Sequence, residues 1–336
     1  MAEKIFDELS RIIYKKNIPL YTVFELTHKC NLSCKHCYIP KNKIQKELKT
    51  EQVKSILKQL AEAGCLHLVL SGGEVFLRKD IMQICEYSRK LNFDLRIFTN
   101  GTLVSRQDAQ KFAEIGISGI EISLYGKEKV HDKITGVKGS FKKTFNAIKL
   151  LKEHGVRIIL KTPIMNINFN EYKWLIKFSN SMDIEYRFDP AIVPMNNGNE
   201  SVLKYQLGKQ NLKKIFEDKK ITPGLKKVSG TLAGNQIDLF CKAGRNFAGI
   251  APNGTVYPCI QFLYPLGNLK DESFGEIWYN SRQIKYIRSL KSYDCRECYS
   301  CAKAAVCRRC PGLVLLETNN LFGKSQIACN LAAAQI

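Results

Sequence analysis

The chain has 336 residues, and its 52 Lys and Arg against 31 Asp and Glu give a formal net charge of +21. This length suggests about two domains with a sizeable core, and an apolar fraction of 45% is ordinary for a soluble globular protein. Met1 to Lys16 lack the apolar stretch of a signal peptide, and no run of residues is long and apolar enough for a membrane span. We therefore expect a cytoplasmic protein that does not act at a membrane.

The first half of the chain alternates short apolar segments with amphipathic ones. The expected strands are 21–26, 66–70, 95–98, 117–124, 157–161 and 185–188. The expected helices between them are 51–63, 80–91, 105–115, 141–154 and 171–180. A repeated strand–helix order predicts parallel strands with right-handed crossovers, in an α/β barrel or an open wound sheet. A functional site is then expected where the strands end.

Polar and small residues follow several of these strands. Cys30, Cys34 and Cys37 form a C-x3-C-x2-C run after the first strand, and three thiolates leave one iron of a four-iron cluster open. The second strand is followed by two glycines and a carboxylate, the third by an Asn-Gly turn and the fourth by a serine. Together these loops predict one pocket, formed by Gly72, Gly73, Glu74, Thr99, Asn100 and Ser123.

Between the two halves, residues 196–235 are rich in Lys, Asn and Gly, and we interpret them as a linker with one amphipathic helix near 210–218. The second half then holds eight cysteines, enough for two sets of four ligands: Cys241, Cys259, Cys295, Cys298, Cys301, Cys307, Cys310 and Cys329. A β-hairpin turning at Pro252 to Gly254 would bring Cys241 and Cys259 together.

Thirteen cysteines without an export signal favour metal binding over disulfides, because cytosolic thiols are kept reduced. A structural zinc site is the alternative, since zinc also uses closely spaced cysteines. Cys65 and Cys85 lie in or beside predicted helices and are expected to be buried apolar residues.

These residues resemble the radical S-adenosylmethionine (SAM) superfamily over about residues 18–190. The run Cys30-Asn-Leu-Ser-Cys34-Lys-His-Cys37 looks like the family's cluster loop, and Gly72-Gly73-Glu74 like its methionine-binding motif. The resemblance implies a partial (β/α)6 barrel and a 4Fe-4S cluster whose open iron binds SAM, with Gly73 and Glu74 holding the SAM amine. It makes Thr99, Asn100 and Ser123 candidates for the ribose and carboxylate, adds Tyr38 as a cofactor-binding candidate, and assigns no catalytic side chain beyond the cluster.

The chain departs from the family pattern at two places. The position before the last cysteine of the loop is often aromatic in the family and is His36 here. The family's His-Asp-x-x-Arg-Gly appears as His131-Asp132-Lys133-Ile134-Thr135-Gly136, which lacks the arginine expected to bind the SAM carboxylate. Lys133, Lys161 and Arg187 are possible substitutes, although a solvated structural lysine is the plainer interpretation.

The second half resembles the SPASM extension of radical SAM enzymes, a small cysteine-rich domain with a β-hairpin and short helices. This resemblance implies two auxiliary 4Fe-4S clusters. It places Cys241, Cys259 and Cys310 on the nearer one and Cys298, Cys301, Cys307 and Cys329 on the farther one, with Cys295 as a candidate eighth ligand. The expected organisation is an N-terminal segment (1–17), a radical SAM partial barrel (18–195), a linker (196–235) and a SPASM domain (236–336).

The resulting hypothesis is a radical SAM oxidoreductase that crosslinks or oxidises a ribosomally made peptide or protein. The basic surface favours acidic partners, whether a peptide, an electron donor or nucleic acid, although a Lys-rich surface can also simply keep a protein soluble. A flavodoxin- or ferredoxin-like protein is the expected electron donor. The alternatives are a radical SAM enzyme of cofactor or tetrapyrrole biosynthesis or of nucleic-acid modification, and a non-catalytic iron-sulfur electron carrier. No RNA-binding motif is recognisable, which disfavours nucleic acid.

Overall fold

The computed structural model describes residues 2–41, 46–221 and 241–336. Within these residues the strands are β1 (Tyr21–Thr27), β2 (His67–Gly72), β3 (Asp94–Thr99), β4 (Gly119–Ser123), β5 (Ile158–Pro163), β6 (Glu185–Asp189), β7 (Phe247–Ile250), β8 (Thr255–Tyr257) and β9 (Gly267–Asn268). The helices are α1 (Ala2–Lys15), α2 (Thr50–Glu62), α3 (Ile81–Lys90), α4 (Arg106–Ile115), α5 (Glu128–Thr135), α6 (Ser140–Glu153), α7 (Tyr172–Ser181), α8 (Lys209–Glu217), α9 (Arg282–Ser289), α10 (Arg296–Tyr299), α11 (Pro311–Thr318) and α12 (Gln326–Ala333).

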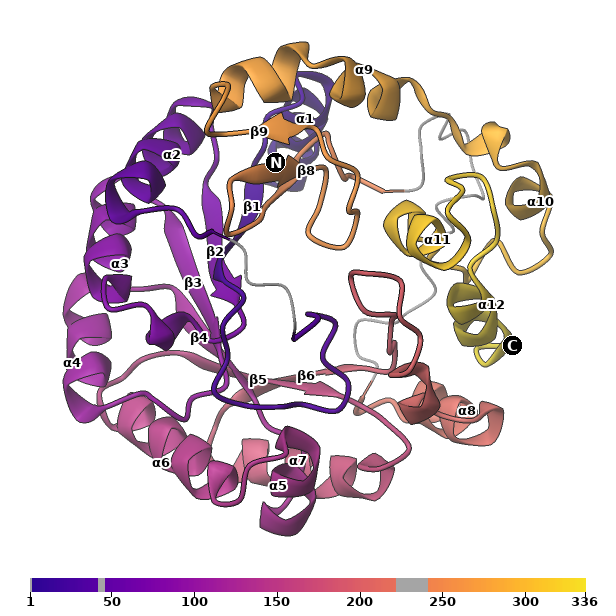
Figure 1. The fold of residues 1–336 in the computed structure, drawn as a ribbon. Coiled ribbons are helices and arrows are strands. Elements are labelled where there is room, and N and C mark those ends of the chain that lie inside the picture. Colours follow the sequence, from indigo (N-terminus) through magenta and orange to yellow (C-terminus); the bar gives the residue numbers. More distant parts are fainter. Residues whose placement is uncertain (1, 42–45, 222–240) are drawn as a thin grey trace.

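All six strands predicted in the first half are confirmed, with ends that shift by a few residues. Strands β1 to β6 pair in parallel in the order of the chain, as repeated β/α units require. The sheet curves without closing, and helices α2, α3, α4 and α6 cover its outer side (Figure 1). The first half is therefore a partial barrel.

The two faces of this sheet differ in chemistry. On the outer face, apolar residues such as Leu68, Leu70 and Ile122 are fully buried in the main hydrophobic cluster, which also holds the buried residues of the covering helices. On the inner face, Glu121 of β4 forms ion pairs with residues of three other strands. Helix packing on one side and a charged interior on the other leave the concave side free for polar ligands.

The second half extends the same sheet. β7 pairs in parallel with β1, and the predicted hairpin is confirmed, since β8 turns back antiparallel to β7. Tyr21 of β1 is sandwiched between His67 and Phe247, with ring centroids 4.3 and 4.9 Å away. The cysteine-rich part is thus joined to the barrel through backbone pairing and ring stacking.

The N-terminal segment forms α1, and its end packs on the second half of the chain. The indole of the fully buried Trp278 donates to the carbonyl of Asn17 at 2.6 Å, and the Arg245 guanidinium lies 4.9 Å from the centre of the Tyr14 ring. The linker helix expected near 210–218 is confirmed as α8, whereas residues 222–235 of the predicted linker lie outside the described residues.

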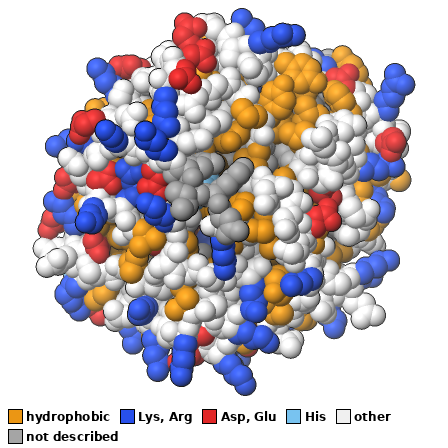
Figure 2. Space-filling model, viewed as in Figure 1, with side chains coloured by type: hydrophobic (Ala, Val, Ile, Leu, Met, Phe, Trp, Pro, Cys, Tyr) orange, Lys and Arg blue, Asp and Glu red, His pale blue; other side chains and the backbone are white. Residues whose placement is uncertain are grey.

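Lys and Arg side chains are spread around the face shown in Figure 2, with acidic side chains among them, and do not gather into one patch. None of the described helices combines the length and apolar character that crossing a bilayer requires.

Candidate functional site

The loop after β1 brings Cys30, Cys34 and Cys37 together. Burial, together with the nearby charges of Cys37 and Cys30, raises the pKa of the Cys34 thiol to about 12. Thiolates that repel one another in this way favour a bound cation or cluster that neutralises them. The structure therefore places the predicted triplet at the end of β1, where parallel strands carry their sites.

A buried carboxylate fixes both sides of this cysteine loop. Glu25 of β1 is 2% exposed and accepts hydrogen bonds from Tyr38 Oη at 2.8 Å and from His28 Nε2 at 2.9 Å. His28 precedes the first cysteine and Tyr38 follows the last. Sequence analysis missed Glu25, although a carboxylate within an otherwise apolar strand was a usable signal.

Helix α5 holds the middle of the loop. The amides of Ser33 and Lys35 donate to the carbonyls of Thr135 and Ile134, at 2.8 and 3.0 Å. These two carbonyls belong to the His131 to Gly136 segment that departs from the family pattern. This segment therefore holds the cysteine loop in place through two backbone hydrogen bonds.

Gly72 and Gly73 allow the loop after β2 to pack directly against the cysteine loop. A Cβ added at Gly73 would lie 2.2 Å from the carbonyl oxygen of Lys29, and one at Gly72 would lie 2.1 Å from that of Thr27. The amide of Gly73 also donates to the Thr27 carbonyl at 2.7 Å. The two glycines are thus required by close backbone approach.

The Glu74 side chain ties this loop to the next one. Its carboxylate is fully buried and accepts hydrogen bonds from the Phe76 amide at 3.1 Å, from Thr99 Oγ1 at 2.7 Å and from the Asn100 amide at 2.8 Å. Thr99 and Asn100 are thereby placed beside the cysteine loop, where the Asn100 side-chain amide donates to Asn31 Oδ1 at 2.9 Å. Three predicted site residues share one network.

Glu74 also provides a test of whether the site fits SAM. Burial raises the pKa of Glu74, and the ion pairs of the described residues give this carboxylate no cation partner. A carboxylate has about four acceptor positions, and the three hydrogen bonds leave room for another donor. An amino group carried by a ligand meets this requirement, so the residues fit the methionine end of SAM.

The basic residues considered for the SAM carboxylate lie in different surroundings. Lys161 and Arg187 lie on the inner face of the barrel and form ion pairs with Glu121, at 3.1 and 3.7 Å. Lys133 on α5 is exposed. Ser123 ends β4 and hydrogen-bonds to the Tyr125 side chain. Contact of any of these residues with SAM stays a prediction.

The cysteines of the second half fall into two groups. In the first, burial together with the charges of Cys310 and Cys259 raises the pKa of Cys241 to about 12. In the second, the pKa of Cys329 is raised by burial and by the neighbouring charges of Cys298 and Cys301, and the charge of Cys329 likewise acts on Cys307.

These groups coincide with the two ligand sets that the sequence suggested, whose role as cluster ligands stays a prediction. Cys295 is fully buried and packs beside Cys298, so it lies next to the second group. Cys65 and Cys85 are buried in the main hydrophobic core, as expected for apolar residues.

A cavity of about 490 Å³ lies between the cysteine loop and the second half of the chain. It is lined by His36 and Tyr38 on one side and by Cys310 on the other, and most of the remaining lining is apolar. Asp189 and Arg308 are its charged residues. Desolvation of the Asp189 carboxyl by the surrounding protein raises its pKa, whereas the positive charges of Lys161 and Arg308 partly offset this increase. A substrate held here would touch both cysteine-rich regions.

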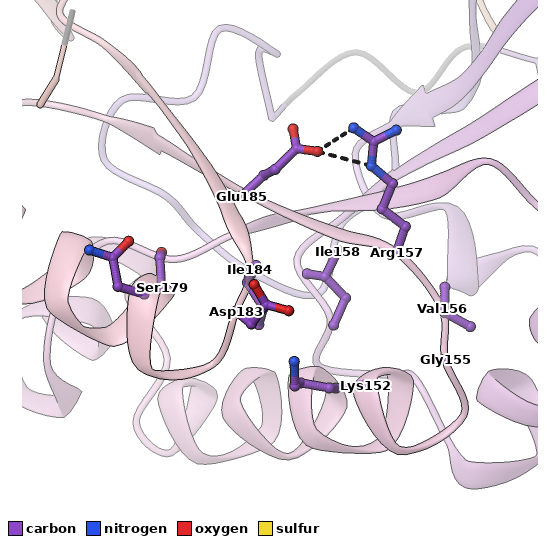
Figure 3. A pocket seen from close by; sticks show the side chains of 10 residues that line it. Lys152, Gly155, Val156, Arg157, Ile158, Ser179, Asp183, Ile184 and Glu185 are labelled. Carbon is purple, nitrogen blue, oxygen red and sulfur yellow. Dashed lines mark hydrogen bonds and ion pairs between the residues drawn. The ribbon is translucent and has the colours of Figure 1, made fainter. Parts of the chain in front are cut away.

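Another hollow, of about 560 Å³, lies at the opposite end of the barrel strands (Figure 3). It is lined by the ends of α6 and α7 and the starts of β5 and β6, and its charged pair is Arg157 with Glu185. No cysteine lines it. It plays no part in the site described above.

Each of the thirteen cysteines, all among the described residues, is a free thiol. Within the described part of the chain, no three His, Cys, Asp or Glu side chains converge closely enough to hold a metal ion. The ligands of a single zinc ion meet at one point, whereas a four-iron cluster spreads its thiolates over separate irons.

Comparisons with known proteins agree with this division of the chain. Residues 24–178 match the model of the radical SAM superfamily, and residues 241–311 match SPASM, an iron-sulfur cluster-binding domain. The AdoMet-dependent heme synthase of Oleidesulfovibrio alaskensis is 25% identical over 315 residues, covering 85% of this chain and 81% of that protein.

One further curated protein and one solved structure are similar to this chain. The antilisterial bacteriocin subtilosin biosynthesis protein AlbA of Bacillus subtilis is 29% identical over 285 residues, 78% of this chain and 60% of that protein. The structure of Streptococcus suis SuiB bound to S-adenosylmethionine has a TM-score of 0.75 and 19% identity, covering 93% of this chain and 77% of that one. At this identity, the likeness to SuiB establishes the fold.

Proposed function

Because the chain is a radical SAM enzyme with a C-terminal SPASM domain, we propose that it modifies a ribosomally made peptide by removing hydrogen from an unactivated carbon. When bound, SAM and the cluster of the cysteine loop supply the 5′-deoxyadenosyl radical that abstracts this hydrogen. The protein supplies binding, orientation and exclusion of water.

The cavity between the two cysteine-rich regions carries this proposal. Its mostly apolar lining and its volume of about 490 Å³ suit a few residues of a peptide inserted as a loop or an end. A substrate in it lies between His36 and Tyr38 of the cysteine loop and Cys310. The AlbA relative, named for biosynthesis of a bacteriocin, supports a peptide.

We assign roles to the residues around the cavity as follows. Glu74 holds the amino group of SAM, and Thr99 and Asn100 are fixed by Glu74 beside the cluster loop. Asp189 and Arg308 offer a carboxylate and a guanidinium that orient the polar backbone or side chains of the peptide. The two groups of cysteines would hold the auxiliary clusters, and these would supply an acceptor for the electron left on the substrate by a two-electron oxidation.

Tetrapyrrole modification is the second candidate, because the heme synthase relative aligns over most of both chains. The cavity argues against it. A tetrapyrrole with several carboxylates needs several cations, whereas the charged lining consists of one arginine and one carboxylate.

Co-expression tests the choice between these candidates. The chain is produced with the small open reading frames encoded beside its gene, and the peptides are examined by mass spectrometry. We expect one peptide to lose two hydrogen atoms, and to remain unchanged when the Cys34→Ala variant is used. Conversion of an iron porphyrin that carries several carboxylates by the purified enzyme, with every peptide unmodified, would contradict the proposal and support the second candidate.

A further inference from the structure

A buried phenol lies directly behind the cysteine loop. Tyr125 follows β4 and is 5% exposed, and its hydroxyl oxygen is 3.9 Å from Cys34 Sγ. Both side chains belong to an apolar cluster whose buried members include Ile134, Met165 and Ile192. The contact is therefore shielded from water, where a hydrogen bond is stronger than at the surface.

The neighbours of the phenol indicate where its proton points. Burial and the charge of Cys34 raise the pKa of Tyr125 well above its usual value, whereas a hydrogen bond from Ser123 lowers it. A cysteine that ligates a cluster is a thiolate and carries no proton. At its contact with Cys34 Sγ, the Tyr125 hydroxyl is therefore the group that can donate.

The backbone and ring of Tyr125 are held on several sides. Its amide donates to Nδ1 of the buried His131 at 3.4 Å, and its carbonyl accepts from the Asn168 side chain at 3.1 Å. The ring of His36 makes an edge contact with the phenol ring, at 5.0 Å between centroids. Burial lowers the pKa of both histidines to about 4, so both are neutral near pH 7 and place no extra positive charge beside the phenol.

We propose that the hydroxyl of Tyr125 donates a hydrogen bond to the thiolate of Cys34 and thereby raises the reduction potential of the cluster held by the cysteine loop. Reduction adds negative charge to the cluster, and a donor to a ligating sulfur stabilises that charge. The inference rests on the proposal that Cys30, Cys34 and Cys37 hold this cluster. It assigns Tyr125 an effect on the ease of reduction, separate from substrate binding.

Replacing Tyr125 by Phe tests the proposal, because it removes the hydroxyl and keeps the ring. The midpoint potential is measured by a redox titration followed by electron paramagnetic resonance, using the signal that changes when SAM is added. We expect a more negative midpoint in Tyr125→Phe, with the iron content unchanged. Tyr172→Phe is the control, because the buried Tyr172 hydrogen-bonds to Asp218 and not to a cysteine of the loop. The midpoint potential of this variant should match that of the unaltered enzyme.

A second arm replaces the Tyr125 side chain by 3-fluorotyrosine. Fluorine makes the phenol a stronger hydrogen-bond donor, so the midpoint is expected to become more positive. A structural role alone would not produce opposite shifts from the two changes. Equal midpoints in all samples would overturn the effect of Tyr125, whereas the absence of any SAM-dependent signal in the unaltered protein would overturn the cluster assignment itself.

Discussion

Two buried carboxylates at this site hydrogen-bond to other residues of the protein and so hold its loops in place. Glu25 links the two sides of the cysteine loop, and Glu74 links the loops after β2 and β3. Both carboxylates are almost fully buried, where a polar group is costly unless it is hydrogen-bonded. They therefore fix the geometry of the loops as well as their charge.

At this scale we predict that Glu74→Gln weakens SAM binding by about tenfold or more, because an amide cannot pair with the ammonium of SAM as a carboxylate does. Equilibrium dialysis against labelled SAM measures the change, with iron content as the control for cluster loading. Unchanged affinity in a fully loaded variant would rule out Glu74 as the partner of the amine.

The pH dependence of SAM binding gives a second prediction at the residue scale. Burial raises the pKa of Glu74, so as the pH falls this carboxyl takes up its proton earlier than an ordinary glutamate does. Affinity for SAM should be highest near neutral pH, where Glu74 is ionised and the amino group is protonated, and should decrease as the pH falls through this raised pKa, whereas Glu74→Gln should not show this decrease. The dissociation constant for SAM is measured as a function of pH in both proteins. The same pH dependence in both would contradict this prediction.

Among the secondary-structure elements, the strands of the first half could be predicted because their residues carry a local signal. Leu68 and Leu70 alternate with residues of the inner face, and the helices between the strands have their own periodicity. The pairing of β7 with β1 carries no such signal, since Tyr21 and Phe247 meet only after folding. The clamp formed by α5 was missed for the same reason.

The loop after β2 provides a prediction at this scale. Gly73→Ala should displace the cysteine loop, because its Cβ would lie 2.2 Å from the Lys29 carbonyl. We expect the variant to lose about four irons per chain and its binding of SAM. Gly208→Ala is the matched control, since a Cβ there meets nothing within 4 Å. Iron analysis measures the change. An equal iron content in the two variants would contradict this account.

Over the whole molecule, the cavity lies between the cysteine loop, which contributes His36 and Tyr38, and the group of cysteines that contains Cys310. The groups in the second half were suggested by the resemblance to SPASM domains, and the structure places Cys241 and Cys259 near Cys310 although they are far apart in the chain. The cavity could not be predicted from the sequence, because it depends on how α12 and the loop after β6 meet in the fold. Cys295 also could not be placed from spacing, and the structure puts it beside Cys298.

The shared sheet makes the two halves depend on each other. Removal of residues 241–336 would expose the edge of β1 that pairs with β7, together with the surface of the N-terminal segment that contacts Trp278. We expect the fragment 1–240 to aggregate or to melt well below the full chain, because an exposed strand edge invites pairing between molecules. A monomeric fragment with the melting temperature of the full chain would show that the halves are independent.

The production of 5′-deoxyadenosine from SAM tests the central claim most directly. The reconstituted and reduced protein, with about twelve irons per chain for three four-iron clusters, should form 5′-deoxyadenosine, and Cys34→Ala should form none. A protein loaded to this level that forms no 5′-deoxyadenosine, or a Cys34→Ala variant that forms as much as the unaltered enzyme, would contradict the account.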